Sequence, residues 1–302
     1  MCLFEIGEPA FYLWQNQNTV VIGRHQNAWK ECRVRLLEEE GGLLVRRSTG
    51  GGAVFHDVGN LNFSFIMPRE QYDVHRQLNV VREACRSFGI ETEFTGRNDL
   101  VISATGAKFS GNAFKFSDTT VLHHGTIMID VDKEKLGRYL VPSKEKLRAK
   151  NIESVRSRVE NLKSHAPDLS IDAMRGALIA AFEGEYDVCK RETVSDLDAA
   201  RLQALTEQFA SWDFRMGASM SFDSTLSHRF DWGELTLELS FKNGRVVSAA
   251  VWSDAMDEAL IDKVAPALNG VRYDRRAIAD ALRPLGAEMA EAADYFESES
   301  EI

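Results

Sequence analysis

The feature that most constrains the fold is a change of hydrophobic period between residues 59 and 89. Over residues 61–67 apolar and polar side chains alternate, with Ile66 as the exception, and this is the period of a sheet strand packed on a core. From Val74 onward, apolar residues recur every three or four positions until Gly89, which indicates an amphipathic helix and its end. The sequence therefore predicts a sheet strand followed directly by a helix with one apolar face.

The remaining segments predict strands and helices that do not alternate regularly. Strands are predicted at residues 11–23 (two strands with a polar turn), 43–47, 53–56, 91–94, 100–103, 108–114 and 126–131, and helices at residues 133–140 and 171–182. Because strands dominate early and helices fall between them irregularly, we expect an α+β fold around a mainly antiparallel or mixed sheet.

A second, smaller unit is predicted near the C-terminus. Residues 189–212 are polar and helical in character, which suits a linker. In "GELTLELSFKNGRVVSAAVWS" apolar residues then alternate up to Asn243 and Gly244, a pair that favours a type I′ hairpin turn. Two helical stretches follow, with a polar tail that we expect to fray. We therefore expect a large domain over residues 1–190, a linker over 191–217 and a small α+β domain over 218–302.

The composition argues against several classes of protein. With 302 residues, 44% of them hydrophobic, the chain can bury a sizeable core. A net charge of −10 argues against a general nucleic-acid coat, and the chain has no run of about 18 apolar residues that would suggest a membrane span. The cysteines are scattered, so neither a disulfide framework nor a zinc site is indicated. We expect a soluble, cytoplasmic protein that binds neither nucleic acid nor membrane.

Residues 45–57, "VRRSTGGGAVFHD", place three glycines between two strand-like segments. Glycine exposes bare backbone amides and lets a ligand approach closely, so the loop could cradle an anion beside Arg46 and Arg47. A flexible β-turn is the more common explanation of a glycine triplet taken alone. A P-loop does not, because the sequence lacks GxxxxGK[ST].

Three further motifs contain polar residues that could join such a loop. In "GRNDLVI", Asn98 and Asp99 suit an ordinary turn, although Asp99 could also hold magnesium. In "AKFSGNAF", Lys108 stands in an otherwise apolar or small segment, where a lysine reaches either solvent or a ligand. In "HHGT", His123 and His124 have no carboxylate at a helpful spacing, so we assign them no metal.

Six motifs that occur in a fixed order identify a family far more specifically than any one of them does alone. They are "VVIGRHQNAWKEC" (20–32), "RRSTGGGAVFHD", "GRNDLV", "AKFSGNA", "HHGT" and "SVRSRVENL" (154–162). In this order they resemble the lipoate–protein ligases over roughly residues 10–165, and the small C-terminal unit is similar to that of the long bacterial form. The resemblance implies that residues 1–190 adopt the catalytic fold shared with biotin–protein ligases and octanoyltransferases.

The resemblance implies a two-step reaction. Lipoate and ATP, with Mg²⁺, give lipoyl-AMP and pyrophosphate. The lipoyl group then passes to a lysine of a lipoyl-acceptor domain, in the E2 subunits of 2-oxo acid dehydrogenases or in the glycine-cleavage H protein. No base for the second step is identifiable, and we expect a monomer.

The same resemblance implies roles for individual residues. Lys108 is the implied catalytic residue, at the carboxylate and α-phosphate, and Asp99 is a candidate magnesium ligand. The residues implied to bind ATP or the adenylate are Arg47, Ser48, Gly50, Gly51, Gly52, Ala53, Val54, Phe55, His56, Asn98 and Lys108.

The segment 139–158 is rich in lysine and arginine. A solvated helix face explains this composition. In the family the corresponding region includes a loop that closes over the adenylate, and a basic strip on an acidic protein could also steer an acidic lipoyl domain towards the site.

Two other functions stay open. In one branch of the octanoyltransferases of this fold a cysteine is acylated, but the corresponding position here is Val121, and no cysteine falls near the glycine loop, Lys108 or "HHG" in sequence. A non-catalytic protein that holds lipoate or an adenylate would keep the fold, although intact Lys108 and Arg47 argue against it. Biotin ligation is disfavoured, because the "GRGRxGR"-like basic spacing of that family is missing.

The family pattern also includes a segment with an "NLAxEE" helix upstream of the position of Phe11, which this sequence does not show. The predicted catalytic domain is therefore short at its N-terminus. Because a packed amphipathic helix buries apolar surface, we expect a chain extended upstream to be more stable.

Overall fold

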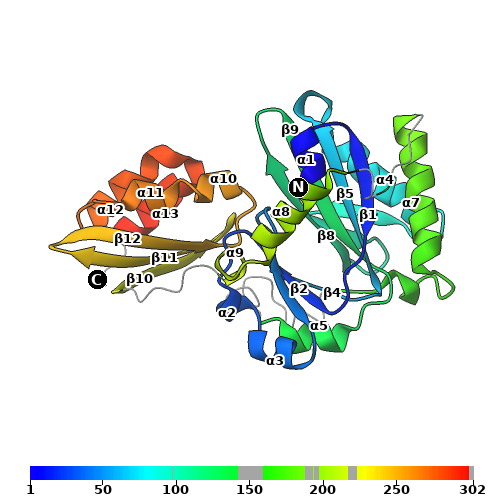
Figure 1. The fold of residues 1–302 in the computed structure, drawn as a ribbon, viewed down its shortest axis with the longest axis horizontal. Coiled ribbons are helices and arrows are strands. Elements are labelled where there is room, and N and C mark those ends of the chain that lie inside the picture. The colour runs from blue at the N-terminus through cyan, green and yellow to red at the C-terminus, as the bar shows by residue number, and fades with distance from the viewer. Residues whose placement is uncertain (97, 142–158, 188–192, 194–196, 217–222, 299–302) are drawn as a thin grey trace.

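The computed structural model describes residues 1–96, 98–141, 159–187, 193, 197–216 and 223–298. Its largest element is a six-stranded sheet in the order β1-β5-β9-β8-β7-β6, in which every neighbouring pair is antiparallel (Figure 1). The strands are β1 (Ala10–Trp14), β5 (Asn60–Pro68), β6 (Thr92–Thr95), β7 (Asp99–Ile102), β8 (Lys108–Phe116) and β9 (Thr120–Met128).

A separate three-stranded sheet makes the architecture mixed. It joins β2 (Thr19–Ile22) in parallel to β3 (Leu43–Arg46) and antiparallel to β4 (Val54–His56). Its buried side chains pack against α2 (Ala28–Glu31), α3 (Val34–Glu39) and α5 (Lys133–Tyr139). The predicted α+β fold with a mixed or antiparallel sheet is confirmed.

The change of hydrophobic period corresponds to a contact between strand and helix. Leu61, Phe63 and Phe65 of β5 are fully buried in one cluster with Leu78 and Val81 of α4 (Val74–Arg86). The second helix on this face, α7 (Ile171–Tyr186), lies beside α4 (Figure 1). At the start of α4 the Asp73 carboxylate accepts hydrogen bonds from two backbone amides, which satisfies donors that a helix N-terminus leaves unpaired.

The segment predicted as a linker contains two helices, α8 (Ala199–Ala210) and α9 (Trp212–Met216). The buried guanidinium of Arg46 fixes α9 to the loop after β2. It donates to the carbonyl oxygens of Phe214 and Arg215 on one side and to those of Gly23 and Gln26 on the other. α8 is held to α1 (Cys2–Ile6) by a paired Arg201–Glu5 contact.

The C-terminal unit has its own sheet and core. Strands β10 (Ser224–Phe230), β11 (Gly233–Lys242) and β12 (Arg245–Ser253) form an antiparallel sheet. The helices of this unit are α10 (Glu258–Ile261), α11 (Val264–Leu268), α12 (Arg275–Leu282) and α13 (Ala287–Ser298). Asn243 and Gly244 both have positive φ (54° and 70°) between paired strands, which confirms the predicted I′-type hairpin.

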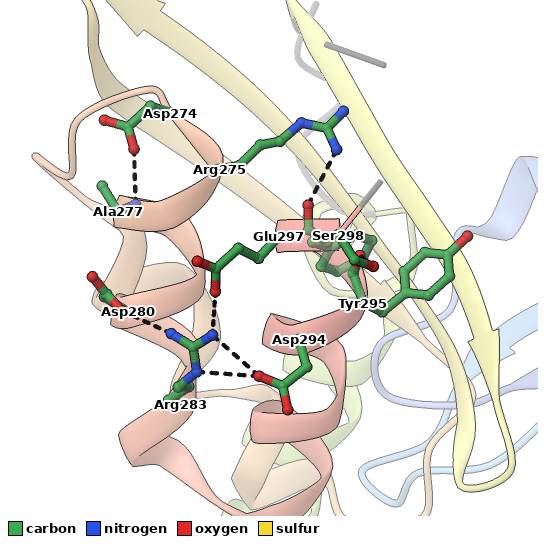
Figure 2. A network of polar contacts seen from close by, with 10 residues as sticks. Asp274, Arg275, Ala277, Asp280, Arg283, Asp294, Tyr295, Glu297 and Ser298 are labelled. Carbon is green, nitrogen blue, oxygen red and sulfur yellow. Dashed lines mark hydrogen bonds and ion pairs between the residues drawn. The ribbon is translucent and has the colours of Figure 1, made fainter. Parts of the chain in front are cut away.

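Ion pairs tie α12 to α13 on the outside of this unit (Figure 2). Arg283, just after α12, donates to Asp280 and reaches across to Asp294 and Glu297 of α13. Asp274 caps the start of α12 by accepting from the Ala277 amide. No helix among the described residues is both long enough and apolar enough to cross a bilayer.

Candidate active site

A cavity of about 280 Å³ is walled by both N-terminal sheets and by three residues of the C-terminal unit. All the predicted site residues except Ser48 and Gly50 line it. Its apolar wall includes Val21, Ala53, Val54, Phe55, Ala113, Met128, Leu136, Leu140, Val141 and Val159, and its polar wall includes Arg47, His56, Asn60, Asn62, Asn98, Asp99, Lys108, Asn112 and His124. An apolar pocket with convergent polar groups suits a ligand that has a hydrocarbon part and a charged part.

The glycine loop connects β3 to β4 and contacts the C-terminal unit. Gly51 has a φ of +87°, which glycine adopts without strain, and its amide donates to the carbonyl of Ala255 at 3.0 Å. Gly50 backs onto the same carbonyl, so close that an added Cβ would lie 2.3 Å from it. Gly52 has open space where its Cβ would be. Of the three glycines, Gly52 therefore offers a ligand the clearest approach to the backbone.

Arg47 holds this loop in shape. Its guanidinium donates to the carbonyl oxygens of Gly50, Gly52 and Val21 and to the hydroxyl of Thr49. Burial lowers its pKa to about 10, which leaves the group charged at neutral pH. The predicted phosphate contact of Arg47 stays a prediction, and the structure adds that Arg47 orders the amides of the loop.

Lys108 and Asp99 come together on the opposite side of the cavity. Lys108 Nζ lies 2.7 Å from Asp99 Oδ1, and 22% and 16% of the two side chains are exposed, so the pair is sheltered yet reachable. The ammonium lies over Gly111, where an added Cβ would come within 2.7 Å of Nζ. The neighbouring strands position the pair, because Asp99 at the start of β7 lies opposite Gly111 of β8.

The role of Asp99 as a magnesium ligand stays a prediction. Its carboxylate already pairs with Lys108, and the described residues contain no group of three or more His, Cys, Asp or Glu side chains that could hold a metal. Magnesium in proteins is commonly bound by one or two carboxylates together with substrate phosphates. Among the described residues the cavity has no preformed magnesium cage, and Asp99 would hold the ion only together with the phosphates of ATP.

The histidines on the cavity wall are neutral hydrogen-bonding groups. Burial, with the charge of Arg47 as a second cause, lowers the pKa of His56 to about 3. Asn16 donates to Nδ1 of His56, so the proton lies on the buried Nε2, which has no partner among the described residues. The same two causes lower the pKa of His124 well below 6.5, and its Nε2 lies 2.7 Å from the Thr49 hydroxyl. Neither ring is suited to act as a base at neutral pH.

Two of the sequence predictions fall elsewhere in the structure. Ser48 does not line the cavity, and its hydroxyl lies 3.4 Å from the sulfur of Met1. Gly50 is turned to the C-terminal unit as described above. The basic segment 139–158 lies outside the described residues from position 142 to 158, although Leu140 and Val141 line the cavity.

Several residues of the cavity wall were not predicted from the sequence. Trp14, Asn60 and Asn62 come from β1 and β5, and the polar residues that alternate with apolar ones in β5 were the only signal for the asparagines. Arg229, Asp254 and Met256 come from the C-terminal unit. Arg229 lies 3.3 Å from Asp254 and 3.4 Å from Glu234, and no local motif marks these positions.

Two family models match the chain. The lipoyl protein ligase A/B catalytic domain matches residues 4–183, and the bacterial lipoate protein ligase C-terminus matches residues 219–300. A curated relative, the lipoate-protein ligase A of Psychrobacter cryohalolentis, is 38% identical over 276 residues, which cover 88% of this chain and 81% of the relative.

Two solved structures are also similar. LipL1 of P. falciparum in complex with lipoate has a TM-score of 0.82 and 28% identity, over 97% of this chain and 88% of that one. A bipartite lipoate protein ligase from Thermoplasma acidophilum, described with its E2 lipoyl domain, has a TM-score of 0.64 and 27% identity, over 74% of this chain and 91% of that one. With the two model matches, these findings show that the chain belongs to the lipoyl protein ligase A/B family and carries the C-terminal domain of the bacterial lipoate protein ligases.

Proposed function

We propose that this protein is an ATP-dependent lipoate–protein ligase. In the first step a carboxylate oxygen of lipoate attacks the α-phosphorus of ATP, the bond to the β-phosphate oxygen breaks, and pyrophosphate leaves. In the second step a lysine amine of the acceptor attacks the acyl carbon, AMP leaves and the amine loses a proton. The observation that carries this proposal is a cavity in which an apolar wall meets Lys108 and the open backbone of Gly52.

Lys108 is proposed to act on the reacting groups. When a carboxylate approaches a phosphate, two anions come together, and fixed positive charge lowers the barrier most when it is oriented in advance. The Asp99 carboxylate and the bare surface of Gly111 hold the ammonium in one place on the wall. Lys108 can then lie between the lipoate carboxylate and the α-phosphate as a compact point charge.

The glycine loop and its neighbours are proposed to bind the nucleotide part. Gly52 presents open backbone, Arg47 keeps the loop ordered and positively charged, and His56 offers its buried N–H. The other lining residues proposed for this role are Gly51, Ala53, Val54, Phe55 and Asn98. Ser48 and Gly50 stay proposals from the family resemblance, because neither lines the cavity. The apolar side chains of the cavity wall are proposed to contact the hydrocarbon chain of lipoate.

Arg229 is proposed as a contribution of the C-terminal unit to the first step. Its neighbour Asp254 is followed directly by Ala255, whose carbonyl accepts from Gly51 at 3.0 Å. The cation therefore lines the cavity beside the glycine loop, where the phosphates of ATP are proposed to bind. A guanidinium fork suits phosphate oxygens.

The acceptors are proposed from the family. The T. acidophilum ligase was described with an E2 lipoyl domain, and we extend this to lipoyl domains of 2-oxo acid dehydrogenase E2 subunits and to the glycine-cleavage H protein. A monomeric state, a cytoplasmic location and magnesium as the counter-ion of the ATP phosphates belong to the same proposal. We also propose the domain division 1–190, 191–217 and 218–302, which the separate hydrophobic core of the C-terminal unit supports.

Acyl transfer through a cysteine is the alternative from the same fold. Cys2, Cys32 and Cys85 are buried, and none of them lines the cavity. Burial raises the pKa of Cys32 and of Cys85 to about 12, which opposes thiolate formation. The described residues therefore favour the ligase.

Mass-resolved detection of the adenylate tests the proposal. Purified protein with lipoate, ATP and magnesium should form lipoyl-AMP, and an apo lipoyl domain added afterwards should gain one lipoyl group. A second reaction with octanoate measures acyl preference. If no adenylate forms but the lipoyl domain is still modified from an acyl donor, the transferase is correct; if lipoate binds and neither step occurs, the protein is a binding module.

A further inference from the structure

His123 lies at the centre of β9, fully buried, and the reaction proposed above does not use it. Its ring stacks on Phe114 and Phe65, with centroids 4.6 and 5.7 Å away, and meets Phe63 edge-on. Both ring nitrogens have an amide partner. Nδ1 lies 2.7 Å from Oε1 of Gln77 in α4, and Nε2 lies 2.9 Å from Oδ1 of Asn112 in β8.

The orientation of the Asn112 amide is fixed by Asn98. Asn112 Nδ2 donates to the Asn98 carbonyl at 3.1 Å, so Asn112 Oδ1 must be the atom that faces His123. Asn98 Nδ2 donates back to the Asn112 carbonyl at 2.7 Å, and the Asn112 backbone amide donates to the Asn98 carbonyl at 2.8 Å. Since Oδ1 only accepts, His123 Nε2 carries the proton.

The tautomer of His123 then determines the orientation of Gln77. A neutral ring with its proton on Nε2 has an accepting Nδ1, which cannot bond to Gln77 Oε1. In that orientation Gln77 Nε2 is also buried without a partner among the described residues. Turning the Gln77 amide so that Nε2 donates to Nδ1 satisfies both atoms. Burial lowers the pKa of His123 to about 3, so the doubly protonated ring is excluded at neutral pH.

The chain of hydrogen bonds ends at the cavity. Asn112 and Asn98 both line it, and Asn98 directly precedes Asp99, the partner of Lys108. Gly125 leaves room for this arrangement, since a Cβ there would lie 2.6 Å from Asn112 Oδ1. The backbone turn that presents Asp99 is thus held by α4 through three buried side chains.

We infer that His123, as the neutral tautomer protonated on Nε2, is a positioning residue that aligns Asp99 with Lys108 through Asn112 and Asn98. This role rests on the proposed function, because the pair it aligns is the one assigned to adenylate formation. His123 itself does not line the cavity and touches no reacting atom.

The tautomer can be measured without any activity. In protein labelled with ¹⁵N-histidine, His123 should show a protonated Nε2 and an unprotonated Nδ1 at pH 7. Gln77→Glu places a carboxylate on Nδ1, so both nitrogens should become protonated at pH 7 in that variant. A wild-type ring protonated on Nδ1, or a Gln77→Glu spectrum identical to wild type, would overturn the relay, that is, the hydrogen-bond chain from Gln77 through His123 and Asn112 to Asn98.

Kinetics test the link to the reaction. His123→Phe keeps an aromatic ring in the stack but loses both hydrogen bonds. The kcat for lipoyl-AMP formation should fall roughly tenfold or more, because misplacement of a reacting group affects the chemical step most. The KM for lipoate should stay within about twofold of the wild-type value. His123→Gln, which can still donate to Asn112, should recover part of the loss. Val81→Ala is the control: it creates a cavity in the same hydrophobic core without removing a hydrogen bond of the relay, and it should keep the wild-type kcat.

The outcomes separate the two proposals. Wild-type kcat in folded His123→Phe would overturn the positioning role while leaving the ligase intact. If the wild-type protein forms no adenylate, the proposed function fails, and the nitrogen spectra still decide whether the relay exists. If His123→Phe does not fold, Gln77→Leu, which removes the bond between α4 and Nδ1, supplies the kinetic comparison; a lowered kcat is expected, and an unchanged one would contradict the role.

Discussion

Lys108 Nζ and Asp99 Oδ1 lie 2.7 Å apart on the wall of the cavity. The contact makes Asp99 the partner of the Lys108 ammonium, which its motif did not predict. It also orients the lysine before any substrate arrives, and orientation in advance is what makes a charged group effective in a transition state.

Removal of the Lys108 ammonium should stop the first step. We expect Lys108→Ala to lower the rate of lipoyl-AMP formation by roughly 100-fold or more, since it removes the fixed charge between two anions. Thermal unfolding should stay close to wild type, because the side chain is no part of a hydrophobic core. Lys163→Ala, which breaks an exposed pair with Asp130, is the control and should leave both properties unchanged. Wild-type adenylation in Lys108→Ala would refute the role.

Gly111 should matter for activity more than for stability. The added methyl group of Gly111→Ala would lie 2.7 Å from Lys108 Nζ, and the flexible end of that side chain can move away at little cost to the fold. The displaced ammonium should then slow adenylate formation by roughly tenfold or more. Gly184→Ala, at a position in α7 with open space, is the matched control. Equal rates for the two variants would contradict this placement of Lys108.

Gly52 separates ligand approach from folding better than Gly51 does. The Cβ added in Gly52→Ala has no heavy atom within 4 Å, so the stability of the fold should be unchanged. The affinity for lipoyl-AMP should fall roughly tenfold, because the methyl group crowds the ligand at a cost of about 1–3 kcal/mol. Gly51→Val, in contrast, imposes a side chain at a φ of +87° and against Arg47, and should destabilise the fold as well. Calorimetric binding and urea unfolding of both variants make the comparison. Unchanged affinity in Gly52→Ala would count against the cradle.

The local elements of the fold were predictable, and the way that the cavity closes was not. The period change at residues 59–89 and the pair Asn243 and Gly244 determine contacts between neighbours in sequence, where the pattern of side chains is sufficient. The β2–β3 parallel pair and the arrival of Arg229 at the glycine loop depend on contacts between distant segments. The local sequence pattern therefore does not predict these contacts.

The pairing of polar site residues also escaped prediction. The motif of Asp99 suited an ordinary turn or a magnesium ligand, and nothing in it indicated a lysine partner. Its actual partner lies on the next strand, and only the β7–β8 register brings the two together. Likewise the hydrogen bonds from Arg47 to the loop that it precedes were not predicted from the sequence, and its phosphate contact stays a prediction.

Acid should destabilise the folded state through its buried histidines. His56 and His123 take up a proton at an ordinary pKa of 6.5 when unfolded but only near 3 when folded, so the unfolded chain binds more protons in this window. The contribution of these histidines to the free energy of unfolding is therefore fully present above pH 6.5. It falls as the pH is lowered towards 3, by about 1.4 kcal/mol per pH unit for each histidine. Urea unfolding at pH 7, 6 and 5 measures this slope, and His123→Gln should reduce it. Identical slopes for the two proteins would contradict a neutral His123.

Arg229 should be needed for one half-reaction and not for the other. If its guanidinium contacts the part of ATP that leaves as pyrophosphate, its contribution ends when lipoyl-AMP has formed. We expect Arg229→Ala to slow lipoyl-AMP formation by roughly tenfold or more, in keeping with the loss of a charged hydrogen bond to phosphate. Transfer from synthetic lipoyl-AMP to an apo lipoyl domain should proceed at the wild-type rate.

Two controls make this prediction specific to the guanidinium. Arg229→Lys keeps a charge but not the fork, and should recover adenylation only in part. Glu234→Gln removes one acid beside Arg229 while leaving the cation in the cavity, and should keep both half-reactions. If Arg229→Ala slows both steps equally, the residue contacts the α-phosphate, which is present in both. If it slows neither, Arg229 serves only its ion pairs with Asp254 and Glu234 within the C-terminal unit.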